Sequence, residues 1–259
     1  MSQRLIFIFC CQLLVLSITL PAWGHFGMVI PSDNIITYED RSVELELSFS
    51  HPFEGQGMDM ARPEEFYVVK DGKRTDLLDS LQKTTVMKGQ SWQTRYKVKR
   101  PGVYQFVMEP KPYWEEAEGL SIIHYTKTLI AAFGAEEGWT EPVGLPVEIV
   151  PLVRPFANYA GNTFVGRVVK DGKPLPRAEI EVELYNPEDR YLAPSDYHIT
   201  QVVQADDQGV FSFTCPQEGW WGFSALVEAD YKLENQAGEE RPVELGGVLW
   251  VYMDEWQNK

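Results

Sequence analysis

Among the side chains of this sequence, histidine offers the widest choice of chemistry, and His25, the histidine nearest the start, is the most informative. If the chain is cut after Gly24, His25 becomes the first residue and carries both an imidazole and a free α-amine. Two nitrogen donors on one residue can close a chelate ring, and the amine, with a reference pKa of about 8, can lose its proton near neutral pH. Nickel, cobalt and copper accept such donors readily. The competing interpretation is that the cut falls there arbitrarily and His25 has no metal role.

A second group of metal-binding residue types begins at His51. The next residue is Pro52, and two glycines follow within five positions, which indicates a loop on which functional residues could sit. The loop then offers two thioethers and a carboxylate in the run Met58-Asp59-Met60. In an extended backbone the two methionines lie on one side and the aspartate on the other, so either kind of donor could face a site shared with His51. Alternatively, the methionines fill gaps in a hydrophobic core.

The two remaining histidines lie in different settings. His124 is in an alternating segment, where it shares a strand face with Ile122 and Thr126. We expect it to be a third imidazole ligand, with a hydrogen-bonded core histidine as the alternative. His198 lies in a polar stretch, so we expect it on the surface and leave it out of the site. The predicted metal site consists of His25, His51, His124, Met58, Asp59 and Met60.

Residues 1–24 have the composition of a secretory signal peptide. Arg4 supplies the positive charge, residues 5–20 are almost all apolar, and small residues stand at Ala22 and Gly24, where the peptidase requires them. An uncleaved membrane anchor is the alternative, although the apolar stretch is short for a transmembrane helix. We therefore expect an exported, soluble protein whose mature chain begins at His25.

The composition narrows the possible functions. The chain of 259 residues has 23 Lys and Arg against 38 Asp and Glu, a net charge of −15. This charge repels phosphate backbones, so nucleic acid is not expected as a partner. Only Cys215 would remain of three cysteines after the cut, so we expect no disulfide partner and a buried thiol. Acidic pairs such as Glu115-Glu116 are expected in solvated loops.

The elements that position these residues are expected to be strands. Short β-branched and aromatic runs alternate with turn residues, and no long segment has helical periodicity. Residues 42–50 alternate between polar and apolar, and Asp71-Gly72 is a strong hairpin signal. Further strands are predicted at 66–70, 92–99, 103–108 and 122–132. Residues 25–150 are therefore predicted to form an antiparallel, Ig-like sandwich.

A second unit is predicted for residues 151–259. Strands at 164–170 and 179–184 flank the turn Asp171-Gly172, and a later turn leads into a strand at 210–215. This order resembles the transthyretin-like or carboxypeptidase-regulatory-like sandwich, a fold that implies no chemistry by itself. The predicted fold class is thus all-β, with two β-sandwich domains after the signal peptide.

Several segments, in order along the chain, are similar to one family. They are the start at His25-Phe26-Gly27-Met28, His51-Pro52 with Met58-Asp59-Met60, Pro112-Tyr113-Trp114-Glu115, Ile123-His124-Tyr125-Thr126-Lys127, residues 151–155 and Gly219-Trp220-Trp221-Gly222-Phe223. Over essentially the whole mature chain they resemble the DUF4198 proteins, the periplasmic component that accompanies energy-coupling-factor nickel and cobalt uptake systems. The resemblance implies a periplasmic metal-binding accessory protein, with Ni²⁺ or Co²⁺ as its ion and membrane-embedded transporter subunits as its partner.

We expect a binding protein rather than an enzyme. The sequence contains no glycine-rich phosphate loop, zinc-protease helix or nucleophile elbow. Two alternatives involve copper, because an amine with imidazoles also suits copper and thioethers suit copper(I). They are a copper carrier and a copper oxidative enzyme built on the terminal histidine. The third alternative is a structural or adhesive pair of sandwiches that binds no metal.

Overall fold

The computed structural model describes residues 24–257, so of the predicted signal peptide only Gly24 lies within the described part. The regular elements there are strands, apart from two short 3₁₀ helices, η1 (Leu78–Ser80) and η2 (Asp196–His198). This confirms the all-β class. Between residues 24 and 257, no helix is long and apolar enough to cross a membrane.

One sheet belongs entirely to the first half of the chain. It runs in the order β1-β3-β8-β7, and β4 pairs with β3. Its strands are β1 (Phe26–Pro31), β3 (Ser42–His51), β4 (Gln56–Met58), β7 (Gln82–Val86) and β8 (Gly89–Lys97). Val43, Leu45 and Leu47 are fully buried, while Glu44 and Glu46 between them are exposed. This alternation directs one face of β3 into a core and the other to solvent.

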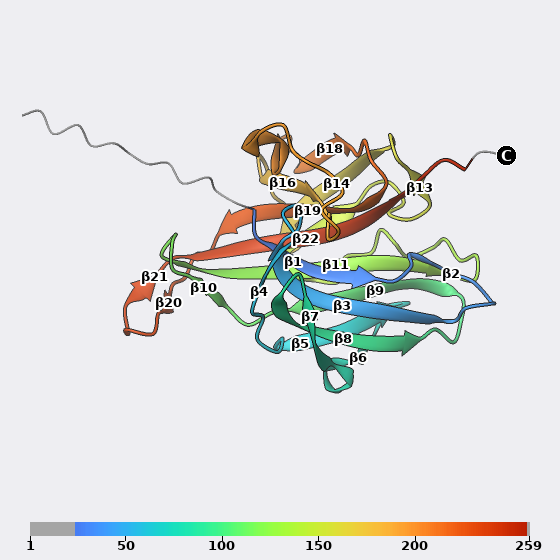
Figure 1. Ribbon diagram of the computed structural model, residues 1–259, viewed down its shortest axis with the longest axis horizontal. Helices are drawn as coiled ribbons and strands as arrows, with labels where there is room; N and C mark the ends of the chain where they lie inside the picture. Colours follow the sequence, from blue (N-terminus) through green and yellow to red (C-terminus); the bar gives the residue numbers. More distant parts are fainter. Residues whose placement is uncertain (1–23, 258–259) are drawn as a thin grey trace, which may run out of the picture.

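A second, longer sheet runs through both halves of the chain. Its main path is β17-β16-β19-β22-β11-β9-β5-β6 (Figure 1). Its strands are β2 (Ile35–Ile36), β5 (Glu65–Lys70), β6 (Lys73–Asp76), β9 (Gly102–Glu109), β10 (Tyr113–Glu115), β11 (Leu120–Ala132), β13 (Asn158–Tyr159), β16 (Glu179–Leu184), β17 (Gln201–Gln204), β19 (Gly219–Glu228) and β22 (Val243–Asp254). The two halves meet where β22 pairs in parallel with β11, from Ser121 opposite Val243 to Thr128 opposite Trp250.

A third sheet covers the second half. It is formed by β12 (Val147–Pro151), β14 (Thr163–Lys170), β15 (Lys173–Pro174) and β18 (Val210–Thr214), while β20 (Leu233–Glu234) and β21 (Glu240–Arg241) make a separate hairpin. Phe164, Phe211 and Phe223 meet in the core between this sheet and the long one. Cys215 is buried in the same core as a free thiol, as the sequence predicts. Both halves are therefore β-sandwiches.

Strand β1 is held between the two halves. Val29 faces the core of the first sandwich, whereas Phe26, Met28 and Ile30 pack with Trp250 of β22 and its neighbours. A Cβ on Gly27 would lie 2.3 Å from the Thr126 hydroxyl, so only glycine allows this close approach. The start of the described chain is thus fixed at the junction of the sandwiches.

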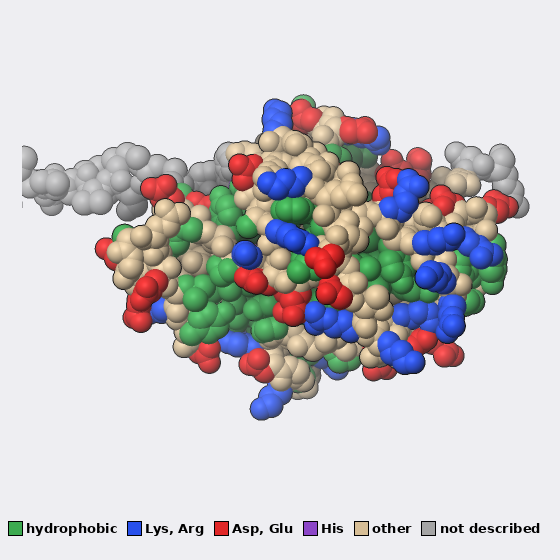
Figure 2. Space-filling view, turned by 90° about the horizontal axis from the view of Figure 1, so that it is seen from below, with side chains coloured by type: hydrophobic (Ala, Val, Ile, Leu, Met, Phe, Trp, Pro, Cys, Tyr) green, Lys and Arg blue, Asp and Glu red, His purple; other side chains and the backbone are tan. Residues whose placement is uncertain are grey.

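The surface shows no simple separation of charge on the face drawn in Figure 2. Acidic and basic side chains are interspersed there among apolar ones. The negative net charge is therefore not gathered into one acidic patch on that face, and the search for a site turns to buried groups.

Candidate metal centre

The register of β1 and β3 brings His25 beside His51. The strands are antiparallel with Phe26 opposite Ser50, so the next pair outward is His25 and His51. Their ring centroids are 4.5 Å apart. The His51 Nδ1 atom donates to the carbonyl oxygen of Gly24 at 3.0 Å. The two histidines are therefore linked through the peptide group that joins Gly24 to His25.

A ring nitrogen of His25 faces an acidic residue. Its Nε2 atom lies 3.1 Å from the Oε2 atom of Glu115, whose side chain is 17% exposed. The prediction that Glu115 lies in a solvated loop was wrong. It ends β10, which pairs with β11 and places Glu115 opposite Leu120. This hairpin carries the carboxylate over the imidazole, where burial strengthens their interaction.

His124 reaches the same region from β11. Phe49 contacts both imidazoles, with ring centroids 5.6 Å from His25 and 5.7 Å from His124. His124 is almost fully buried, and its Nδ1 atom accepts from the Gly27 amide at 3.4 Å. Among residues 24–257 its Nε2 atom makes no hydrogen bond, but it lies 3.6 Å from a carboxylate oxygen of Glu244, close enough for an ion pair when the ring is protonated. A buried imidazole nitrogen that lacks a hydrogen bond and lies near a carboxylate fits a site that takes a further ligand.

Burial controls the charge of these rings. It lowers the pKa of His25 to about 4, aided by the neighbouring His51 and His124 and opposed by Glu115. Burial also lowers the pKa of His51, against the opposing effects of the Gly24 carbonyl and Glu115. Both rings are therefore neutral near pH 7. Neutral imidazole is the form that binds metal ions.

Met58, Asp59 and Met60 of the predicted site lie at and just after the end of β4, which pairs with β3, and Met58 lies opposite Phe49. The Asp59 carboxylate accepts from the Gln90 amide at 2.8 Å. Met60 is buried in the core of the first sandwich, and Met58 packs against that core. Asp59 and Met60 also line a cavity of about 230 Å³ that reaches His124. Met60 thus fills the core, as the alternative interpretation proposes.

Sequence reasoning missed a pair of carboxylates from the second sandwich. A Cβ added to Gly24 would lie 2.7 Å from Glu183 Oε1 and 3.0 Å from Glu181 Oε2. Thr200 donates to Glu183 and lies 3.4 Å from the Gly24 amide. The sequence predicted a strand at 179–184, but nothing in it indicated that Glu181 and Glu183 approach Gly24. Only the packing of β16 against Gly24 brings them there.

In the part of the chain that the structure describes, no three His, Cys, Asp or Glu side chains are already arranged to hold a metal ion. The contacts of the histidines give a physical reason. With Gly24 in place, His51 Nδ1 donates to the Gly24 carbonyl, His25 Nε2 faces Glu115, and the backbone nitrogen of His25 is an amide. The residue types fit a metal ion, but their donor atoms are engaged elsewhere.

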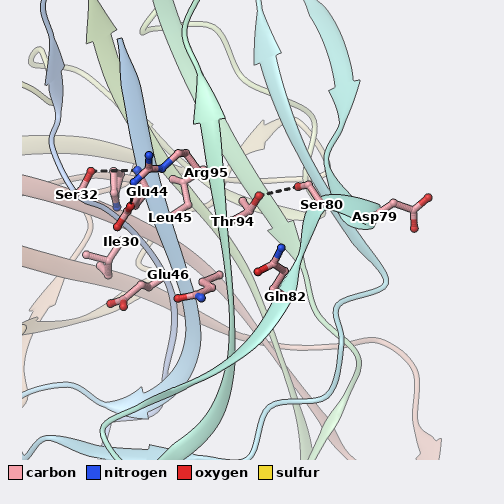
Figure 3. Close-up of a pocket in the computed structure, with 12 residues that line it drawn as sticks. Ile30, Ser32, Glu44, Leu45, Glu46, Asp79, Ser80, Gln82, Thr94 and Arg95 are labelled. Carbon is pink, nitrogen blue, oxygen red and sulfur yellow. Dashed lines mark hydrogen bonds and ion pairs between the residues drawn. The ribbon is translucent and has the colours of Figure 1, made fainter. Parts of the chain in front are cut away.

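Two other regions contain polar groups but differ from this cluster of buried imidazoles. His198, as expected, is exposed, and its Nδ1 atom pairs with Ser195 at 2.9 Å. A cavity of about 840 Å³ lies against the outer face of β3 and β8 (Figure 3). The figure shows Thr94 and Ser80 bonded to each other there, and Arg95 forms an ion pair with Glu44. Among residues 24–257, no histidine lines this cavity, and two pairs of its polar side chains bind each other.

A family model gives the chain its classification. The model described as "Domain of unknown function (DUF4198)" matches residues 22–229. The chain belongs to this family. The region that defines it as a DUF4198 protein contains the three histidines and all three glutamates that surround Gly24 and His25. No curated protein sequence matches the chain.

Solved structures resemble this DUF4198 protein only distantly. The D0-D1 domain of intimin is 12% identical, covering 86% of this chain and 99% of its own, with a TM-score of 0.25. The titin Ig tandem A164-A165 is 10% identical, covering 90% of this chain and 100% of its own, with a TM-score of 0.20. Murine CEACAM1b is 11% identical, covering 88% and 98%, with a TM-score of 0.20. Similarity at this level carries no argument about function.

Proposed function

We propose that this protein, once exported and cut after Gly24, binds a divalent transition-metal ion through the amine and imidazole of His25 together with His51 and His124. We also propose that the protein captures nickel or cobalt for a membrane uptake transporter. The observation that carries the first proposal is the hydrogen bond from His51 Nδ1 to the Gly24 carbonyl. It supports the proposal because it holds the peptide group between Gly24 and His25, whose nitrogen would become the amine, against a second imidazole.

The cut would create one donor and release another. The oxygen and nitrogen of a peptide group share one carbon, so the His25 nitrogen lies close to the oxygen that His51 Nδ1 now contacts. Removing Gly24 turns that nitrogen into an amine and takes away the carbonyl partner of His51. One proteolytic step would thus bring an amine, its own imidazole and the Nδ1 atom of His51 together in the same place.

His124 is the third imidazole of the proposal. It contacts the Phe49 ring, as His25 does, and its buried Nε2 atom makes no hydrogen bond among residues 24–257 and lies near the Glu244 carboxylate. Gly246 lies opposite it, and a Cβ there would come within 2.4 Å of the His124 ring. The ring is therefore held tightly in position, which reduces the entropy lost on binding an ion.

The choice of nickel or cobalt rests on the family resemblance. Nitrogen donors suit Ni²⁺, Co²⁺ and Cu²⁺ alike, and Cu²⁺ normally binds most tightly to any such set. The metal held in the cell is then decided by supply rather than by affinity alone. A soft, thioether-based copper(I) site receives less support, because Met60 belongs to the hydrophobic core.

The test is a metal titration of the exported protein, with its first residue verified by mass spectrometry. We expect Ni²⁺ and Co²⁺ to bind with a dissociation constant of roughly 1 μM or tighter by calorimetry. Inserting one alanine between Gly24 and His25, which leaves an extra residue before His25, is expected to weaken binding at least about tenfold.

His51→Ala should weaken binding similarly, and His198→Ala is the matched control, because His198 is exposed and bonded to Ser195. Equal affinities in all four proteins would exclude the proposed site. Peroxide formation with copper and ascorbate, but not with nickel, would support the copper oxidative enzyme in its place.

A further inference from the structure

Glu181 and Glu183 lie on the same side of β16 and face Gly24, the first described residue. Glu183 is almost fully buried, and its Oε1 atom accepts from Thr200 while its Oε2 atom accepts from the Phe53 amide. Across residues 24–257, neither carboxylate forms an ion pair with a basic side chain. Placing two carboxylates beside one glycine without a basic side chain costs free energy.

A separate observation on the neighbouring strand also indicates a missing partner. Ser224 of β19 is paired with Glu181 across the ladder, so their side chains lie on the same face of the sheet. Ser224 is fully buried, and its hydroxyl oxygen has no hydrogen-bond partner among the residues that the structure describes. Buried hydroxyl groups normally have one. The polar lining beside Glu181 is therefore incomplete.

The position of Gly24 connects these groups to the histidines. Its α-carbon is bordered by oxygens of Glu181 and Glu183, and its carbonyl oxygen contacts His51 Nδ1. Thr200 lies next to its amide nitrogen. Residues of both sandwiches therefore enclose one residue, which the predicted cut removes.

We propose that the space filled by Gly24 in the uncut chain becomes the metal site, and that Glu181 and Glu183 provide its oxygen donors. This inference rests on the proposed function and specifies the ion further. Amine, imidazole and carboxylate donors together suit a divalent ion such as Ni²⁺, Co²⁺ or Zn²⁺, and they disfavour Cu⁺, which prefers sulfur ligands. A divalent cation would also compensate the charge of both acids. Its binding would join the second sandwich to the first.

The test compares isosteric amide variants of the exported, processed protein. Glu181→Gln and Glu183→Gln are each expected to weaken Ni²⁺ and Co²⁺ binding at least about tenfold in calorimetry. Glu179→Gln is the matched control, since Glu179 lies on the same strand but is exposed, and it should change affinity less than about twofold. The visible absorption spectrum of bound Co²⁺ should change in the first two variants and stay the same in the third.

The outcomes separate this inference from the proposed function. Unchanged affinity and an unchanged Co²⁺ spectrum in the Glu181 and Glu183 variants, with loss of binding in the His51 variant, would overturn the inference and leave the histidine site standing. Retained binding in all variants would exclude both. Far-ultraviolet circular dichroism checks that each variant is folded, and full binding by a folded Glu181→Gln, Glu183→Gln double variant would also overturn the inference.

Discussion

Two regions of the molecule bury carboxylates in different ways. In the first, Glu148 of β12 lies 2.5 Å from the ammonium of Lys127, both side chains are 1% exposed, and backbone amides of Val143 and Gly144 also donate to Glu148. In the second, Glu183 accepts from Thr200 and from the Phe53 amide, and within residues 24–257 neither it nor Glu181 pairs with a basic side chain. A buried acid with its own cation is part of the fold, whereas a buried pair without one indicates a place for a ligand.

The comparison extends to the histidines on the far side of Gly24. Burial lowers the pKa of His25 to about 4 and raises that of Glu181 to about 8. The same cause acts in opposite directions, because a low dielectric disfavours whichever form carries charge. Around pH 6, His25 and Glu181 are therefore both largely uncharged. The contributions of the histidines and of the glutamates to the free energy of unfolding must then change with pH in opposite directions.

The largest expected effect comes from the paired carboxylate. Lys127→Met leaves Glu148 buried without a cation and should lower the free energy of unfolding by about 3–5 kcal/mol, as measured by urea denaturation. The double variant Lys127→Met, Glu148→Gln removes both charges and should recover much of this loss. If the single variant cost less than about 1 kcal/mol, the Lys127–Glu148 pair would not differ from the unpaired acids as described.

The unpaired carboxylates should behave in the opposite way. Their pKa values are raised in the folded state, so the fold holds protons that the unfolded chain loses above its ordinary pKa of 4.5. Stability should therefore fall as pH rises from about 4.5 to 8. In metal-free protein that retains Gly24, replacing both by glutamine should raise the free energy of unfolding at pH 8 by roughly 2–3 kcal/mol and flatten this decline.

Urea denaturation at pH 5 and pH 8 checks this prediction, with Glu179→Gln as the control. An identical pH dependence in the double variant and the parent would show that these acids have a cation partner after all.

The smallest effect concerns the imidazoles. Their pKa values are lowered in the folded state, so protonation favours the unfolded chain, and stability should be lost as pH falls from 6.5 toward 4. His51→Gln should remove roughly 1 kcal/mol of this loss in metal-free protein, measured as the difference in thermal unfolding between pH 7 and pH 4.5. His198→Gln should leave the acid dependence as it is. A parallel response in the two variants would argue against a buried, neutral His51.

Many of the longer strands could be predicted from the sequence, because their signals are local. Residues 42–50 alternate, and the turn at Asp71-Gly72 has both residues in the left-handed region, as its hairpin requires. Strand β22 carried no such pattern. It is buried on both faces between β11 and β19, so its apolar residues run continuously instead of alternating. Its parallel pairing with β11 depends on contacts more than a hundred residues apart.

The candidate site likewise has residues that the sequence predicted and residues that it did not. The sequence pointed to His25, His51 and His124 because imidazole is a strong metal-binding group whatever surrounds it. It failed for Glu115 and for the Glu181–Glu183 pair, because an acidic residue in a sequence looks the same whether solvent or another strand lies in front of it.

By itself, the sequence determined the all-β class and the residue types with metal chemistry, since strand alternation, turn preferences and donor chemistry are properties of short segments. Only the tertiary structure decided which of those residues meet. The antiparallel register of β1 and β3 sets His25 against His51, and the joining of both sandwiches along β22 brings two glutamates to the same glycine. Burial, which gives these groups their unusual pKa values, exists only once distant segments have packed together.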